Sequence, residues 1–193
     1  QGVGTVFNNG ALAVCVGQAY DKEYEENQTI TLNDYLEMIE KKTGALLSLC
    51  MEIPALLANQ DDEVCSKLRK FGYDIGKGFQ IQDDILEIFS GVEAMGKSLG
   101  SDVIANKQTA LTLMARKMVP QDWNKFCNGQ ESQTIDEKLA GLRTFFEDTA
   151  VYEETTAMAD KYFKDAVNAL AIVPYPGRED LLAYTNFIKN REY

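Results

Sequence analysis

The sequence of 193 residues contains no histidine, and its four cysteines are Cys15, Cys50, Cys65 and Cys127. These cysteines are scattered and lack the close spacing that metal ligands require. A zinc site and catalysis by histidine are therefore excluded. Reduced cysteines in a cytoplasmic protein are the simplest interpretation.

Basic residues are outnumbered, because 19 lysines and arginines stand against 30 acidic residues, for a net charge of −11. This balance argues against direct binding of nucleic acid, which needs Lys and Arg to neutralise phosphates. A phosphate ligand would have to be bound through cations. The sequence has no run of about 18 apolar residues and no secretory leader, so we expect a soluble protein without a membrane span.

Strand patterns are scarce, and most apolar residues recur at intervals of three and four, which is the period of a helix. The sequence therefore predicts one all-α domain over residues 1–193. Thr31 or Asn33 is expected to cap one helix, and Thr134 with Glu137 matches a capping box for another. The predicted helices cover residues 3–19, 32–52, 61–90, 107–119, two segments from 134 to 170, and a last helix after a turn at 173–180.

The segment FQIQDDILE, residues 79–87, places three carboxylates in an otherwise apolar helix. Asp83, Asp84 and Glu87 share one helix face with Gln80, because residues three and four apart are neighbours. A solvated acidic face is the ordinary explanation, but no basic residue lies between positions 78 and 94 to compensate the charges locally. A Mg²⁺ ion that bridges to substrate phosphates would compensate the negative charges of these carboxylates. Glycines at positions 72 and 76 continue the stripe and are expected to leave room for a ligand.

A lysine also points inward in YLEMIEKKTGALLSL, residues 35–49. Lys42 falls on the apolar face of this helix, whereas Lys41 falls on the solvent face. A snorkelling lysine is the ordinary explanation. With Thr43 as a further donor, Lys42 would suit an anion held near the carboxylates.

The segment SGVEAMGKSLGSDVIANKQT, residues 90–109, has no helical period and is long for a loop in a compact domain. Lys97 and Lys107 lie in it among glycines. Taken alone it would be an exposed loop. Together with the carboxylates and the inward lysine, it indicates a site for a polyphosphate with an apolar companion.

FQIQDDILE and the downstream GKSLGSDVIANKQT resemble the second aspartate-rich region of the trans-isoprenyl diphosphate synthases, the polyprenyl synthetases. The upstream GQAYD and KKTG resemble two further motifs of that family, in the same order. The resemblance implies an all-α bundle around a central cavity. It also implies Mg²⁺-dependent condensation of an allylic diphosphate with isopentenyl diphosphate, and a homodimer.

The resemblance assigns roles by position in each motif. Asp83 is expected to bind Mg²⁺ directly, with Asp84 and Glu87 assisting. The residues expected to contact or line the substrate site are Gln18, Asp21, Lys42, Thr43, Phe79, Gln80, Lys97 and Lys107. A buried, hydrogen-bonded amide is the alternative for Gln18.

Two departures from the family pattern qualify this interpretation. Glu87 stands where the family usually has Asp, which predicts a shifted metal geometry. The family's first aspartate-rich motif and the arginines that bind isopentenyl diphosphate do not occur in these residues. The chain therefore resembles the C-terminal part of a synthase, and we expect it to be inactive alone. The alternatives are a non-catalytic partner of a synthase, a class I terpene cyclase relative, or a helical interaction domain without a ligand.

Overall fold

The structure, a computed structural model, describes residues 2–25, 27, 29–90, 107–129 and 134–191, and these residues form helices and no strand. The elements are α1 (Val3–Tyr24), α2 (Leu32–Ile39), the π-helical segment η1 (Glu40–Gly44), α3 (Ala45–Leu57), α4 (Asp62–Phe89), α7 (Ala110–Met118), α8 (Pro120–Asn128), α9 (Ile135–Asp148), α10 (Val151–Ala169), the 3-10 turn η3 (Leu170–Ile172) and α11 (Gly177–Lys189). The prediction of an all-α fold is confirmed. Within this described part of the chain, no helix is both long and apolar enough to cross a membrane.

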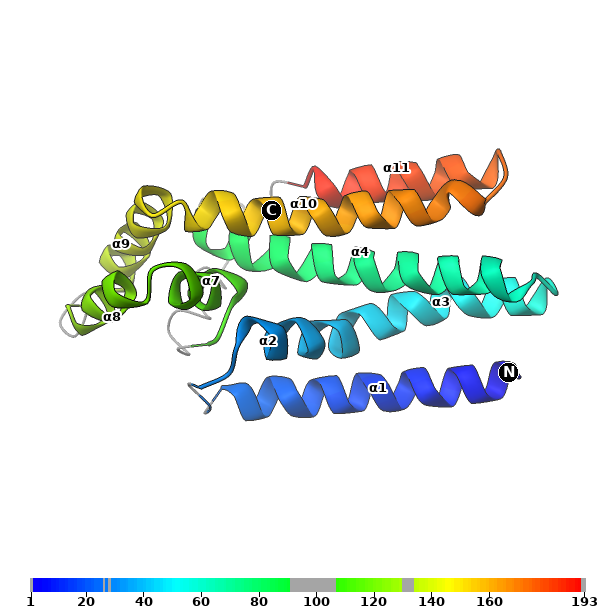
Figure 1. Ribbon diagram of the computed structural model, residues 1–193, viewed down its shortest axis with the longest axis horizontal. Coiled ribbons are helices and arrows are strands. Elements are labelled where there is room, and N and C mark those ends of the chain that lie inside the picture. The colour runs from blue at the N-terminus through cyan, green and yellow to red at the C-terminus, as the bar shows by residue number, and fades with distance from the viewer. Residues whose placement is uncertain (1, 26, 28, 91–106, 130–133, 192–193) are drawn as a thin grey trace.

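Helix α4 is the central element of the bundle (Figure 1). It packs against α3 and η1 on one side and against α10 on the other. Helix α1 lies at one edge against α3 and η1, α11 lies beside α10, and α7, α8 and α9 gather at one end. The buried core runs along α4 and includes Phe71, Ile75, Ile81, Ile85 and Ile88. This arrangement confirms that the helix carrying the carboxylates is enclosed by protein.

Glycines allow α4 to approach the helices beside it closely. A Cβ atom on Gly72 would lie 2.4 Å from the backbone of Ser48, and one on Gly76 would lie 2.4 Å from the Cα of Gly44. Contacts this short do not occur, so only glycine fits at either position. The expectation that these glycines leave room for a ligand is therefore wrong, because α3 and η1 fill the space.

Most predicted helix boundaries agree with the structure. Thr31 caps α2 and Thr134 caps α9, each in a capping box. Helix α8 was not predicted. It begins at Pro120, which suits the first position of a helix because proline has no N–H to leave unpaired there. The last helix begins at Gly177, inside the segment predicted as a turn.

Candidate active site

Lys42 points toward α1 from the π-helical segment η1. Its Nζ lies 2.7 Å from Oδ2 of Asp21, and both side chains are 26% exposed. The neighbouring Lys41 instead pairs with Glu37 one helical turn away, at 2.5 Å. Single-turn π-helices are frequent at functional sites, and both lysines lie in this one. Two residues predicted to share a site, Lys42 and Asp21, are in direct contact.

Thr43 connects η1 to the carboxylate helix. Its hydroxyl donates to Oε1 of Gln80 at 3.2 Å, and Nε2 of Gln80 approaches Oδ1 of Asp84 at 3.5 Å. Gly17 of α1 contacts the backbone at Lys42, and Gly44 contacts Gly76 of α4, so these helices cross closely here. Motifs that are far apart in the sequence therefore meet where α1, η1 and α4 cross.

Asp84 is buried, with 7% of the residue exposed. Its Oδ2 accepts hydrogen bonds from the hydroxyl of Tyr35 and from the backbone N–H of Ala110, each at 2.7 Å. Tyr35 belongs to α2 and Ala110 is the first residue of α7. The second aspartate of the motif thus joins three helices.

Asp83 lies on a different side of α4, and its side chain is 46% exposed. Arg191 donates to its Oδ1 at 2.9 Å and also to the carbonyl oxygen of Phe79 at 3.1 Å. The guanidinium of Arg191 stacks on the Phe79 ring, with Cζ 3.9 Å from the ring centroid. The sequence shows no local cation for these carboxylates, and the fold supplies one from beyond α11.

Lys107 and Glu87 lie in the described residues, and each has an interaction partner. The pKa of Glu25 is lowered, first by the hydrogen bond from Lys22 and in smaller part by the charges of Lys107 and Lys42. Lys107 and Lys42 therefore act on the same end of α1. Lys97 lies outside the described residues.

Gln18 is exposed on α1, so the alternative of a buried amide does not hold for it. It lies one helical turn before Asp21, and residues at this spacing share a helix face. Gln18 is therefore accessible to a ligand on the side of α1 that carries the ion pair with Lys42.

The predicted Mg²⁺ ion can be tested against the oxygens that the described residues offer. Those residues contain no cluster of three or more Asp, Glu, Cys or His side chains that could enclose a metal ion. Asp84 already accepts two short hydrogen bonds, so the other carboxylates to consider on this helix are Asp83, whose Oδ1 is paired with Arg191, and Glu87. This small number of protein oxygens fits a Mg²⁺ ion that keeps several waters and bridges to substrate phosphates. It does not fit a Mg²⁺ ion that is enclosed by protein ligands alone.

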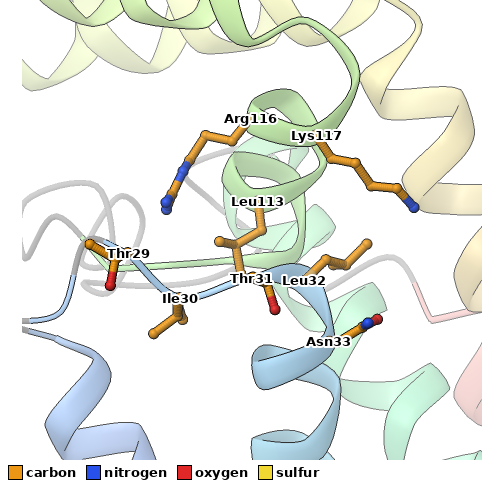
Figure 2. A pocket seen from close by; sticks show the side chains of 8 residues that line it. All are labelled: Thr29, Ile30, Thr31, Leu32, Asn33, Leu113, Arg116 and Lys117. Atoms are coloured by element: carbon orange, nitrogen blue, oxygen red, sulfur yellow. The ribbon is translucent and has the colours of Figure 1, made fainter.

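A cavity of about 360 Å³ lies between the start of α2 and α7. It is lined by Thr29, Ile30, Thr31, Leu32, Asn33, Leu113, Arg116 and Lys117. Figure 2 shows Arg116 and Lys117 extending away from each other. The Thr29 and Thr31 hydroxyls donate to Asn27 and Asp34, so they are already engaged. None of the predicted site residues lines this cavity, and we do not assign it to the active site.

Sequence reasoning missed two residues of this region. Tyr35 begins the segment YLEMIEKKTGALLSL and was not predicted to be part of the site, although a buried phenol usually needs a hydrogen-bond partner. Arg191 carried no comparable signal, because it lies 108 positions from Asp83 and only the packing of α11 brings the two together.

The described helices form an all-helical protein in which carboxylates, lysines and an amide lie together where α1, η1 and α4 cross. A family model described as polyprenyl synthetase matches residues 2–143. The chain belongs to the polyprenyl synthetase family.

Individual relatives agree with this family. The chain is 32% identical over 190 residues to a geranylgeranyl diphosphate synthase of Methanosarcina mazei, covering 97% of this chain and 57% of that protein. It is 45% identical over 103 residues to a geranylfarnesyl diphosphate synthase of Natronomonas pharaonis, covering 53% of this chain and 30% of that protein. The geranylgeranyl pyrophosphate synthetase of Pyrococcus horikoshii has a similar structure, with a TM-score of 0.89 and 27% identity over 98% of this chain and 58% of that one. The chain thus spans little more than half the length of the relatives that match almost all of it.

Proposed function

We propose that this chain forms part of the active site of a trans-isoprenyl diphosphate synthase, which joins an allylic diphosphate to isopentenyl diphosphate. The observation that carries the proposal is the convergence of the motifs at one crossing of helices. Lys42 contacts Asp21, Thr43 contacts Gln80, and Asp83 lies on the same helix as Gln80. Membership of the polyprenyl synthetase family supports the same function.

The side chains suit the departure of a diphosphate group. Lys42 forms an ion pair with Asp21, and its partly exposed ammonium has three N–H donors with which to bind an anion. Lys107, and in our proposal Lys97, would add positive charge on the same side. Asp83 and Glu87 would hold Mg²⁺, which supplies stabilisation of the negative charge on the leaving group. Phe79 and Gln80 would line the site beside these charges.

The proposal is tested by calorimetric titration of this chain with a non-hydrolysable farnesyl diphosphate analogue, with and without Mg²⁺. We expect binding that requires Mg²⁺ and that Asp83→Ala and Lys42→Ala each weaken about tenfold or more, a loss of about 1.4 kcal/mol. Lys41→Ala is the matched control, because Lys41 pairs with Glu37 and points elsewhere. Equal losses in the Lys41 and Lys42 variants would contradict the proposal.

We further propose that this chain binds the allylic diphosphate without completing the condensation. Its 193 residues contain one aspartate-rich motif, whereas the family mechanism uses two. We expect no prenyl transfer by the isolated chain, and transfer when a segment that supplies the first motif is joined to it. Robust transfer by the chain alone would contradict this expectation.

Two other roles remain distinguishable from a synthase. A non-catalytic partner would tolerate changes at Lys42 and Asp83 without loss of activity in its complex. A class I terpene cyclase would release cyclic hydrocarbons and would not consume isopentenyl diphosphate. Product analysis with both diphosphates therefore separates these roles.

A further inference from the structure

We propose that Asp84 is a positioning residue that joins α2, α4 and α7 and thereby orients Lys42 and Lys107. Asp83 is then the residue that holds the cation. The inference rests on the proposed function only for the part that concerns the cation. The two adjacent carboxylates differ sharply in their surroundings. Asp84 is 7% exposed, whereas the side chain of Asp83 is 46% exposed.

Asp84 already makes two hydrogen bonds to other helices. One of its oxygens, Oδ2, accepts from the Tyr35 hydroxyl and from the Ala110 N–H at 2.7 Å each. Tyr35 is itself only 2% exposed, so water cannot replace the carboxylate. If Asp84 turned toward a cation, it would leave two buried donors unsatisfied, each with a full desolvation penalty. A cation at Asp83 would compete with one contact from Arg191, whose Nη2 also donates to the carbonyl oxygen of Phe79.

Asp84 also accepts a hydrogen bond from the first residue of α7. This helix has no acidic residue in its first turn, and its cap Thr109 satisfies the N–H of Thr112. Asp84 therefore provides, from another helix, the negative charge that favours a helix N-terminus. Because Lys107 lies three residues before Ala110, the bond that fixes the start of α7 also restrains the segment from which Lys107 extends.

Asp84 is connected to the segment of Lys42 through Gln80 and Thr43. Gln80 lies between Asp84 and Thr43, with contacts of 3.5 Å and 3.2 Å. Thr43 follows Lys42 in the π-helical segment, so the orientation of Gln80 affects the segment that aims Lys42. A single buried carboxylate thus connects the two segments that carry the described lysines of the site.

The test compares Tyr35→Phe, Asp84→Asn and Asp83→Asn. Asp83→Asn is the matched control, because it makes the same chemical change one position away. We expect Tyr35→Phe and Asp84→Asn to lower the midpoint of thermal unfolding by several degrees and to lose hydrogen-exchange protection at the Ala110 amide. Asp83→Asn should leave the Ala110 amide protected and should lower the unfolding midpoint by less than the other two variants, because it weakens only the half-exposed pair with Arg191. The double variant of Tyr35 and Asp84 should be less destabilised than the sum of the single variants, because both remove the same bond.

The second readout is binding of Mn²⁺, used as a spectroscopic probe, with inorganic diphosphate present. Asp83→Asn should weaken it about tenfold or more, and Tyr35→Phe should weaken it by much less. If Asp84→Asn abolishes Mn²⁺ binding while its unfolding midpoint and the Ala110 amide are unchanged, Asp84 is a cation ligand and the inference is wrong. Absence of Mn²⁺ binding by the unsubstituted chain would contradict the proposed function, whereas the unfolding and exchange results would still decide the role of Asp84.

Discussion

Single residues of this bundle hold charges where burial makes them costly, and each is balanced by a partner from another helical turn or another helix. Glu52 on α3 is 4% exposed and accepts hydrogen bonds from Nε and Nη2 of Arg69 on α4, at 2.7 and 2.5 Å. Asp74 is also buried, and burial raises its pKa although Lys70 donates to it. The pair of Glu52 and Arg69 joins α3 to α4, and separating these helices would leave its charges unmatched.

Arg69→Ala is predicted to destabilise the protein by about 3 kcal/mol, at the low end for a broken buried pair, because Arg69 itself is 43% exposed. The loss arises from the Glu52 carboxylate that stays buried without its partner. Denaturant unfolding monitored by circular dichroism measures the change.

The control for this prediction is the double variant with Glu52→Gln. Removing the charge should recover part of the stability lost in Arg69→Ala. A double variant less stable than Arg69→Ala would show that the packing of Arg69, rather than its charge, is what matters.

At the scale of elements, helix crossings depend on glycine where backbones touch. Gly17 brings α1 against η1, and Gly76 brings α4 against the end of η1. A Cβ atom at Gly17 would lie 2.2 Å from the backbone nitrogen of Lys42. The π-helical segment is therefore held between two helices, which fixes the direction of Lys42 and Thr43.

Gly76→Ala is predicted to destabilise the protein by about 1–3 kcal/mol or more, because the added methyl group meets backbone that cannot rotate away. Gly4→Ala is the matched control, since a Cβ there has nothing within 4 Å. Gly4 lies in the first turn of α1, where alanine should stabilise by at most the roughly 1 kcal/mol found in a helix interior. Thermal unfolding of both variants checks the pair. Equal effects of the same sign would mean that close approach does not decide the cost at Gly76.

At the scale of the whole molecule, α1 is the least enclosed of the long helices. Its buried residues are Val6, Gly10 and Gly17, while Phe7 is 55% and Leu12 is 64% exposed. Large apolar side chains exposed along one helix indicate a surface that other protein covers. This agrees with the expectation of a homodimer, which stays a prediction.

We predict that the chain associates through α1. Light scattering should report the mass of two chains, and Phe7→Glu with Leu12→Glu should shift it to the mass of one chain. Exposed Phe187 on α11, which is 73% exposed, provides the control Phe187→Glu, which should leave the mass unchanged. A single-chain mass for the unsubstituted protein over a range of concentrations would contradict this prediction.

The sequence by itself determined most of the helices, several of their caps and the family, because helical period, capping boxes and motifs are local patterns. It also placed Asp21, Lys42, Thr43 and Gln80 in one site, and the structure brings these residues together in two contacting pairs.

Only the tertiary structure decided which partner each polar group has. It paired Asp83 with Arg191 across 108 positions and placed Asp84 against Tyr35 and Ala110. It also showed that Gly72 and Gly76 serve helix packing and not a ligand. The reason is physical: a helix face can be read from spacing, but what occupies the space opposite that face depends on how distant helices pack.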